Sequence, residues 1–393
     1  MSRNAERLAQ AVLDAVRTVI PDERPVPLHA PEIGEAEREC VLKTLDSQWI
    51  SSSAGTVDDF ESMLADYTGA QFVVSTVNGT AALHLALLTL GIGPGDEVIV
   101  PALTFVATAN AVAHCGAVPH FADSEPDSLG LDPDALEAYL RSIIIRDGGH
   151  CINRHTGRPI RAIVCTHIFG RPAHIHALSQ VAEAFELPLV EDAAEALGSR
   201  VSGTHMGRFG KLGALSFNGN KIVTAGGGGA VMTDDPELAA KMRHIGTTAR
   251  VAHRWRLRHD AIAYNYRMPS LNAAMGLAQM ARLEGFLSNK NRLLARYVEA
   301  FSAVEGVSVM APASTGVGNN WLIAAVLDEP SLAQRDAILD ALVDDGIHAR
   351  PVWDLLHGLP MYAQAPRMAL PVAERMEAAL ICLPSSPILG EAA

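Results

Sequence analysis

VEDAAEALGS (190–199) and GALSFNGNKIVTAGGGGAV (213–231) are the two segments that decide how this chain folds and what it could do. The first places a carboxylate, Asp192, directly after the apolar run 187–190. The second places Lys221 between Ser216 and a run of four glycines. An acid, a lysine and a glycine-rich turn are the groups needed to hold pyridoxal phosphate, since the lysine can bond to the cofactor aldehyde and the acid can contact the pyridine nitrogen.

Both charged residues also have ordinary explanations. Lys221 is one of five lysines, and it alone follows a short apolar strand and a Ser/Asn/Gly turn. Burial there would lower its pKa and free the amine for imine formation, but the spacing alone leaves a structural lysine equally open. Asp192 ends an expected strand, where ligands bind in open α/β sheets. It also precedes the helical sequence AAEAL, and an N-cap is the commoner role of such an aspartate.

Four further residues could contact the same ligand. Gly79 and Thr80 lie between an expected strand and the helix AALHLALL, and a helix N-terminus attracts phosphate through its free N–H groups. Ser216 is a second possible donor. An ordinary turn and helix cap would explain this segment as well. Phe105 follows another strand and could stack on a pyridine ring, although a lone phenylalanine more often belongs to a core.

The pattern along the chain predicts an α/β fold. From about residue 57, short β-rich runs alternate with helical ones, which favours a largely parallel sheet covered on both faces. We expect an N-terminal helical extension over 1–27, a large domain over 28–250 and a small α+β domain over 251–393. Residues 145–160 are expected to form a surface insertion.

The composition excludes several classes of protein. A net charge of −13 over 393 residues argues against a nucleic-acid surface. Five scattered cysteines without CxxC spacing indicate reduced thiols and a cytoplasmic location. The N-terminus lacks the apolar core of a signal peptide, and the uncharged stretch 98–118 is broken by proline and glycine, so no membrane span is expected. A His-x-His pair at 174–176 has no third ligand nearby, so no metal site is expected.

Taken together, these residues resemble the DegT/DnrJ/EryC1/StrS aminotransferases, which are sugar aminotransferases of fold type I that depend on pyridoxal phosphate. The resemblance covers about residues 28–387 and rests on several motifs in order. They are WISSSAGTVDDFE (49–61), NGTAALHLAL (78–87), GDEVIVPALTFVATANAV (95–112), VEDAAEALGS (190–199), SFNGNKIVTAGGGG (216–229) and YNYRMPSLNAA (264–274). It implies the aspartate aminotransferase-like architecture, with a mostly parallel, seven-stranded type of sheet in the large domain and a small C-terminal domain.

The resemblance also implies roles for individual residues. Lys221 would be the Schiff-base lysine and proton shuttle, and Asp192 would bind the pyridine nitrogen. Glu195 would lie near the ring hydroxyl, where many relatives have glutamine or histidine. Asn265 would reach the cofactor phosphate of a neighbouring subunit, which implies a homodimer with shared active sites. The remaining cofactor contacts implied are Gly79, Thr80 and Ser216 at the phosphate and Phe105 against the ring.

Within the family the chain resembles the LegC-like branch, on the stretches 27–37, 46–55, 124–133, 319–322 and 348–362. This implies transfer of an amino group from glutamate (or glutamine) to the C4 ketone of a nucleotide-linked 4-keto-6-deoxy sugar, with UDP-4-keto-6-deoxy-N-acetylglucosamine as the expected substrate. A C3 keto sugar, a GDP-sugar, a keto-cyclitol and a non-catalytic regulatory role remain the alternatives. The expected substrate contacts are Ser52, Asn320, Trp321, Arg350 and His357.

Overall fold

The computed structural model describes residues 3–52 and 55–391. The first two residues of the expected N-terminal extension and residues 53–54 of the WISSSAG motif lie outside the described residues. Among the residues described, no helix is both long and apolar enough to cross a membrane.

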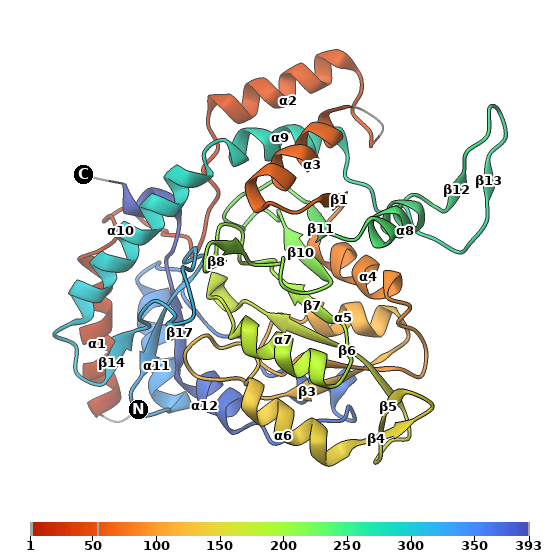
Figure 1. The fold of residues 1–393 in the computed structure, drawn as a ribbon. Helices are drawn as coiled ribbons and strands as arrows, with labels where there is room; N and C mark the ends of the chain where they lie inside the picture. The colour runs from red at the N-terminus through yellow and green to blue at the C-terminus, as the bar shows by residue number, and fades with distance from the viewer. Residues whose placement is uncertain (1–2, 53–54, 392–393) are drawn as a thin grey trace.

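A mixed, mostly parallel sheet forms the centre of the large domain, which confirms the expected fold class (Figure 1). One strand, β11, runs antiparallel to both of its neighbours, while the pairs from β10 to β3 are parallel. The order across the sheet is β1 (Phe72–Thr76), β11 (Gly229–Thr233), β10 (Leu212–Ser216), β7 (Leu189–Asp192), β6 (Pro159–Thr166), β2 (Glu97–Pro101) and β3 (Val118–Ala122).

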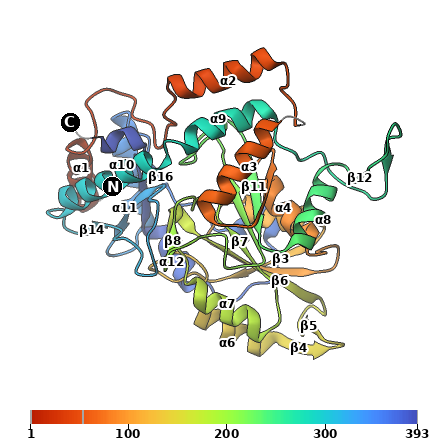
Figure 2. The same cartoon turned by 45° about the horizontal axis from the view of Figure 1, so that its top comes forward.

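The strands are short and buried along almost their whole length, because helices cover both faces of the sheet. One group of helices comprises α4 (Gly79–Thr89), α5 (Ala107–His114) and α8 (Pro236–Gly246), and the other comprises α6 (Pro133–Ile143) and α7 (Ile175–Ala184) (Figures 1 and 2). Helix α4 is apolar on all sides and is almost entirely buried, as expected of a helix inside a large domain. Asn78 begins it by accepting a 2.8 Å hydrogen bond from the N–H of Ala81.

Three more helices form an outer layer beside β1. Helix α3 (Gly55–Thr68) contacts the sheet edge, α9 (Ser270–Met280) packs on α3, and α2 (Glu35–Ser47) lies outermost against α9. Helix α9 is followed directly by a second helix, α10 (Leu283–Phe301), and the two meet near residues 281–282.

A second hydrophobic core lies at the other end of the molecule. Its antiparallel sheet has the order β14 (Val307–Val309), β15 (Ile323–Leu327), β17 (Leu380–Leu383) and β16 (Arg350–Pro351), with helices α10, α11 (Leu332–Asp344) and α12 (Pro371–Ala379). The N-terminal helix α1 (Arg3–Arg17) joins this core by packing on α11, whereas α9 packs in the first core. The division at residues 28 and 251 stays a prediction, and the packing places α1 with the C-terminal core.

Two hairpins leave the body of the fold. The expected insertion at 145–160 contains β4 (Ile144–Asp147) and β5 (His150–Asn153), and β5 extends the central sheet by pairing with β6. Buried Glu97 fastens this segment by accepting hydrogen bonds from Asn153 and Thr156. The hairpin β12 (Arg250–Val251) and β13 (Arg258–His259) projects away from the molecule in both views (Figures 1 and 2).

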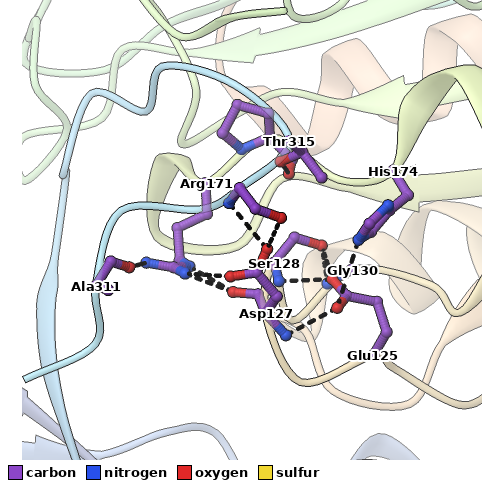
Figure 3. Close-up of polar contacts among 10 residues, drawn as sticks. Glu125, Asp127, Ser128, Gly130, Arg171, His174, Ala311 and Thr315 are labelled. Carbon is purple, nitrogen blue, oxygen red and sulfur yellow. Dashed lines mark hydrogen bonds and ion pairs between the residues drawn. The ribbon is translucent and has the colours of Figure 1, made fainter. Parts of the chain in front are cut away.

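A buried arginine fastens the two cores together (Figure 3). The Arg171 guanidinium donates to the backbone carbonyl of Asp127 and, at 2.6 Å, to that of Ala311. The Asp127 carboxylate in turn accepts from the backbone N–H of Ser314 at 2.9 Å. Segment 311–315, in the connection between β14 and β15 of the second sheet, is thereby tied to the loop after β3 and to the segment before α7.

Candidate active site

A pocket with an empty volume of about 940 Å³ opens at the carboxyl ends of the central strands. Such edges are where open α/β sheets bind ligands. Residues of segments 190–199 and 213–231 meet in this pocket. Of the expected site residues, its lining includes Gly79, Thr80, Phe105, Asp192, Glu195, Ser216, Lys221, Trp321 and Arg350.

Lys221 projects into this pocket from the loop after β10. Its side chain is 12% exposed, and its Nζ lies 3.2 Å from a carboxylate oxygen of Glu195. The same Nζ lies 3.9 Å from the ring centroid of Trp321. The amine is therefore enclosed on two sides while it still lines the pocket.

Asp192 ends β7 and is buried beside the same cavity. Its carboxylate accepts a 2.7 Å hydrogen bond from the hydroxyl of Thr108 and a 3.2 Å bond from the N–H of Ala194. Burial raises the pKa of Asp192, and these two donors, together with the charge of Lys221, act in the opposite direction. The N–H of Ala194 makes a turn with this carboxylate, but no α-helix follows, so the helix-cap explanation is wrong.

The N-terminus of α4 forms a cradle for an anion. The first N–H groups of a helix have no partner within the helix, and here they come from Gly79 and Thr80, which line the pocket. A side chain at Gly79 would put its Cβ 2.8 Å from the Cβ and 3.1 Å from the hydroxyl oxygen of Ser216. Only glycine therefore lets the helix start and this serine close on one small ligand.

The donor set fits pyridoxal phosphate. A lysine amine, a buried carboxylate and an anion cradle line one cavity, so the reactive aldehyde, the ring nitrogen and the phosphate each have a matching group. The run Gly226–Gly229 is absent from the pocket lining. At Gly229 a Cβ would lie 2.5 Å from the carbonyl oxygen of Asn78, so this glycine lets β11 pass close to the start of α4.

Glu195 links the lysine to a strained turn. One carboxylate oxygen faces Lys221, and the other accepts a 2.8 Å hydrogen bond from the N–H of Phe169. Phe169 has φ of +56° and Gly170 has φ of +81°, so two successive residues are left-handed. This conformation is costly for phenylalanine and persists only where surrounding contacts hold it.

An aromatic wall lines the outer part of the pocket. Trp353 lies between Phe105, at 6.3 Å between ring centroids, and Phe169, at 5.5 Å. The Arg350 guanidinium stands 5.6 Å from the Trp353 ring. Phe105 is 49% exposed, so a face of this ring remains available to a ligand.

The other expected contacts lie elsewhere. Asn265 and Ser52 line a second pocket, with Arg250, His253 and Arg267 around it and no acidic residue in its lining. Asn320 lies outside the main pocket and bonds to Asn291 at 2.8 Å. His357 is also outside the lining of the main pocket.

Three residues that line this pocket or contact Asp192 were not identified from the sequence. Thr108 is part of the motif that contains Phe105, and its hydroxyl contacts Asp192. His167 follows β6 at the same sheet edge, where it bonds to buried Glu191 at 3.0 Å. Its place just after an apolar strand is the signal that could have found it. Trp353 lies within the stretch 348–362, but nothing in the sequence indicates which aromatic residue of that stretch faces the cavity.

Comparisons with known proteins agree on one family. Residues 31–393 match the model of the DegT/DnrJ/EryC1/StrS aminotransferase family. The chain is 37% identical over 365 residues to a GDP-perosamine synthase of Caulobacter vibrioides, covering 92% of this chain and 94% of that protein. It is 34% identical to a GDP-perosamine synthase of Escherichia coli O157:H7, covering 93% and 94%. Among solved structures it is similar to DesI in the presence of its TDP-sugar product, with a TM-score of 0.80, 31% identity and coverage of 92% and 88%.

Proposed function

The chain belongs to the DegT/DnrJ/EryC1/StrS aminotransferase family and is a sugar aminotransferase that depends on pyridoxal phosphate, and we propose that it aminates the C4 ketone of a nucleotide-linked 4-keto-6-deoxy sugar. The observation that carries this proposal is the single pocket in which Lys221, Asp192 and the α4 cradle meet. The amino donor we propose is glutamate.

Each residue has a task in this reaction. When bound, pyridoxal phosphate supplies an electron sink for the charge that develops on the carbon beside the reacting nitrogen. Asp192 would hold a proton on the ring nitrogen, with Thr108 keeping its carboxylate oriented for this. Lys221 would bond to the cofactor at rest, and as a free amine it would remove the proton on the reacting carbon and return it. Gly79, Thr80 and Ser216, which line the pocket, would hold the phosphate.

The assignment of Lys221 can be tested directly. Reduction of the protein with borohydride after addition of pyridoxal phosphate should leave a pyridoxyl group on the peptide that contains Lys221. Lys221→Ala should lose this label and the half-reaction with glutamate, while Lys211→Ala, at an exposed loop position, should keep both. A half-reaction that survives in Lys221→Ala would refute the assignment.

Two nucleotide sugars are the leading candidates. The expected branch of the family supports UDP-4-keto-6-deoxy-N-acetylglucosamine. The names of the two relatives support a GDP-linked sugar instead. Incubation with glutamate and a panel of UDP-, dTDP- and GDP-linked 4-keto-6-deoxy sugars, followed by mass spectrometry, decides between them by the mass of the aminated product.

Arg350 is the group that we propose to bind the anionic part of a substrate. It lines the main pocket, and its buried Nε has no hydrogen-bond partner among the described residues. A guanidinium pairs with carboxylate or phosphate through two parallel bonds, and lysine cannot reproduce this geometry. Arg350→Lys should therefore raise KM for the substrate whose anion it binds.

We also propose that two copies of the chain share their active sites. Asn265 lines a separate basic pocket, as would be required if it served the cofactor phosphate of a partner. Asn265→Ala should weaken cofactor retention, and mixing it with Lys221→Ala should regenerate activity in hybrid dimers that contain one intact site. Absence of any recovery in the mixture would refute sharing.

A further inference from the structure

The amine of Lys221 is enclosed by two groups that the reaction scheme above does not use. Glu195 offers a carboxylate oxygen at 3.2 Å, and Trp321 offers its ring, with the centroid at 3.9 Å. A carboxylate and the face of an indole both attract an ammonium ion, and the attraction is stronger where little water enters. The Glu195 side chain is 10% exposed and Trp321 is 2% exposed, so both interactions take place away from bulk water.

Trp321 is fixed in this position by three hydrogen bonds. Its indole N–H donates to the carbonyl of Asn220 at 2.7 Å, and its backbone N–H donates to the side chain of Asn319 at 2.8 Å. Its carbonyl accepts from the buried amine of Lys290 at 2.7 Å. Because Asn220 directly precedes Lys221, the bond from the indole ties the ring to the segment that carries the lysine.

Glu195 is fixed just as firmly. Its second carboxylate oxygen is held by the N–H of Phe169, and its backbone carbonyl accepts a 2.8 Å bond from Asn319. At Gly170 a Cβ would overlap the Asn319 amide oxygen at 1.7 Å, so the left-handed turn and the asparagine are built around each other. The following residue, Arg171, belongs to the clamp between the two cores (Figure 3).

We propose that Glu195 and Trp321 form an ammonium dock that holds Lys221 beside the reacting carbon while the lysine carries the proton that it has removed and has yet to return. The dock rests on the proposed function, in which Lys221 is the lysine that bonds to pyridoxal phosphate. In the dock, Trp321 contacts Lys221 and not a substrate, because the amine of Lys221 occupies the face of the Trp321 ring. Glu195 gains a task beyond contact with the ring hydroxyl, and that task requires a carboxylate.

Other charged groups near the dock act in both directions. Burial raises the pKa of Glu195, whereas the charge of Lys221 and the N–H of Phe169 lower it. The carboxylate of Asp192 adds a second negative charge near the lysine. Burial lowers the pKa of Lys290, whose amine contacts the carbonyl of Trp321. Burial, together with the charges of Lys290 and Lys221, also lowers the pKa of His29. Glu195 is the group closest to the amine, so the dock depends chiefly on it.

The test measures the protonation of Lys221 in the loaded protein. Reconstitution with pyridoxamine 5′-phosphate leaves the lysine unbonded, and brief acetylation with limiting acetic anhydride across a pH series then reports its free-base fraction. Peptide mass spectrometry gives the midpoint for Lys221, and exposed Lys211 in the same digest serves as the reference. We expect Glu195→Gln to lower the Lys221 midpoint by about 1–3 pH units, the usual effect of losing an opposite charge at this range.

Trp321 is tested by a matched pair of substitutions. Trp321→Leu should lower the midpoint by about 0.4–1.5 pH units, the equivalent of a lost cation–π contact, and Trp321→Phe should keep most of it. An unchanged acetylation midpoint of Lys221 in Glu195→Gln refutes the dock. Equal midpoints in Trp321→Leu and Trp321→Phe refute the contribution of the Trp321 ring. If Trp321→Leu does not fold, Glu195→Gln decides alone. Failure of borohydride to label Lys221 would instead refute the proposed function.

Discussion

Substitution of Gly79 by alanine tests how tightly the phosphate cradle is built. The new methyl group would lie 2.8 Å from the Cβ and 3.1 Å from the hydroxyl oxygen of Ser216. Neither backbone segment has room to retreat, so the Ser216 side chain must turn away. Ser216 is held in β10 by its pairing with Gly229, and Gly229 itself lies against the backbone at Asn78.

The expected cost follows from that geometry. Overpacking a fixed site costs about 1–3 kcal/mol, of which alanine recovers up to about 1 kcal/mol through its greater helix propensity. The free energy of unfolding should therefore fall by about 0–2 kcal/mol. The serine hydroxyl, however, moves out of line with a phosphate, and a hydrogen bond to a charged group contributes about 1.5–3 kcal/mol. The dissociation constant for pyridoxal phosphate should rise by about 10–150-fold.

Titration of the cofactor-free protein with pyridoxal phosphate, followed by absorbance, measures this constant. Gly93→Ala is the matched control, because a Cβ at Gly93 meets nothing within 4 Å and its φ is not left-handed. A folded Gly79→Ala protein that binds the cofactor as tightly as the parent would refute the reasoning. So would an equal loss of affinity in Gly93→Ala.

Three further substitutions test other parts of the molecule. Thr108→Val removes the donor to Asp192 and should lower kcat/KM by about 10–100-fold, as measured by steady-state kinetics with glutamate. Arg171→Met should lower the free energy of unfolding by at least about 2 kcal/mol in urea denaturation, because bonds from a charged group to two carbonyls are lost. Burial raises the pKa of Glu97, but hydrogen bonds from His120 and two other side chains outweigh it and leave the pKa lowered. The ionised form therefore adds stability above pH 4.5 that is lost as pH falls through the folded-state pKa, and Glu97→Gln should flatten this acid limb of the stability profile.

Each of these has its own control. Thr108→Ser restores the hydroxyl and should recover most of the activity, and no recovery would contradict the role given to that bond. Arg141→Met removes an exposed arginine and should cost less than about 0.5 kcal/mol, so a similar cost at both arginines would contradict the clamp. An acid limb that is unchanged in Glu97→Gln would show that other carboxylates dominate it.

The sequence was most informative where local rules act alone. Strands that are buried on both faces need continuous apolar runs, and a strand end followed by a polar residue marks the ligand edge of the sheet. These rules placed Asp192, and a helix start placed Gly79 and Thr80, in what the structure shows to be one pocket. His167 obeys the same rule as Asp192 and could have been found in the same way.

The rest depends on contacts between distant segments. No periodicity indicates that α1 packs with the C-terminal core, since an amphipathic helix reveals that it has an apolar face but not which partner covers it. The conformation at Phe169 is equally hidden, because phenylalanine rarely adopts positive φ and only the tertiary contact with Glu195 reveals it. Trp321 was expected to meet a substrate, and only the packed structure places its ring against Lys221.

The glycine run after Lys221 serves the packing of the fold more than the pocket. The structure leaves this run outside the pocket lining, whereas Gly79, Thr80 and Ser216, the residues expected at the phosphate, line the pocket. Gly229 pairs with both Thr76 and Ser216, and its missing side chain admits the carbonyl of Asn78. Since Asn78 caps α4, the glycine sets where that helix begins. Its contribution to phosphate binding is therefore indirect: it brings Gly79 against Ser216, and those two residues would make the contact.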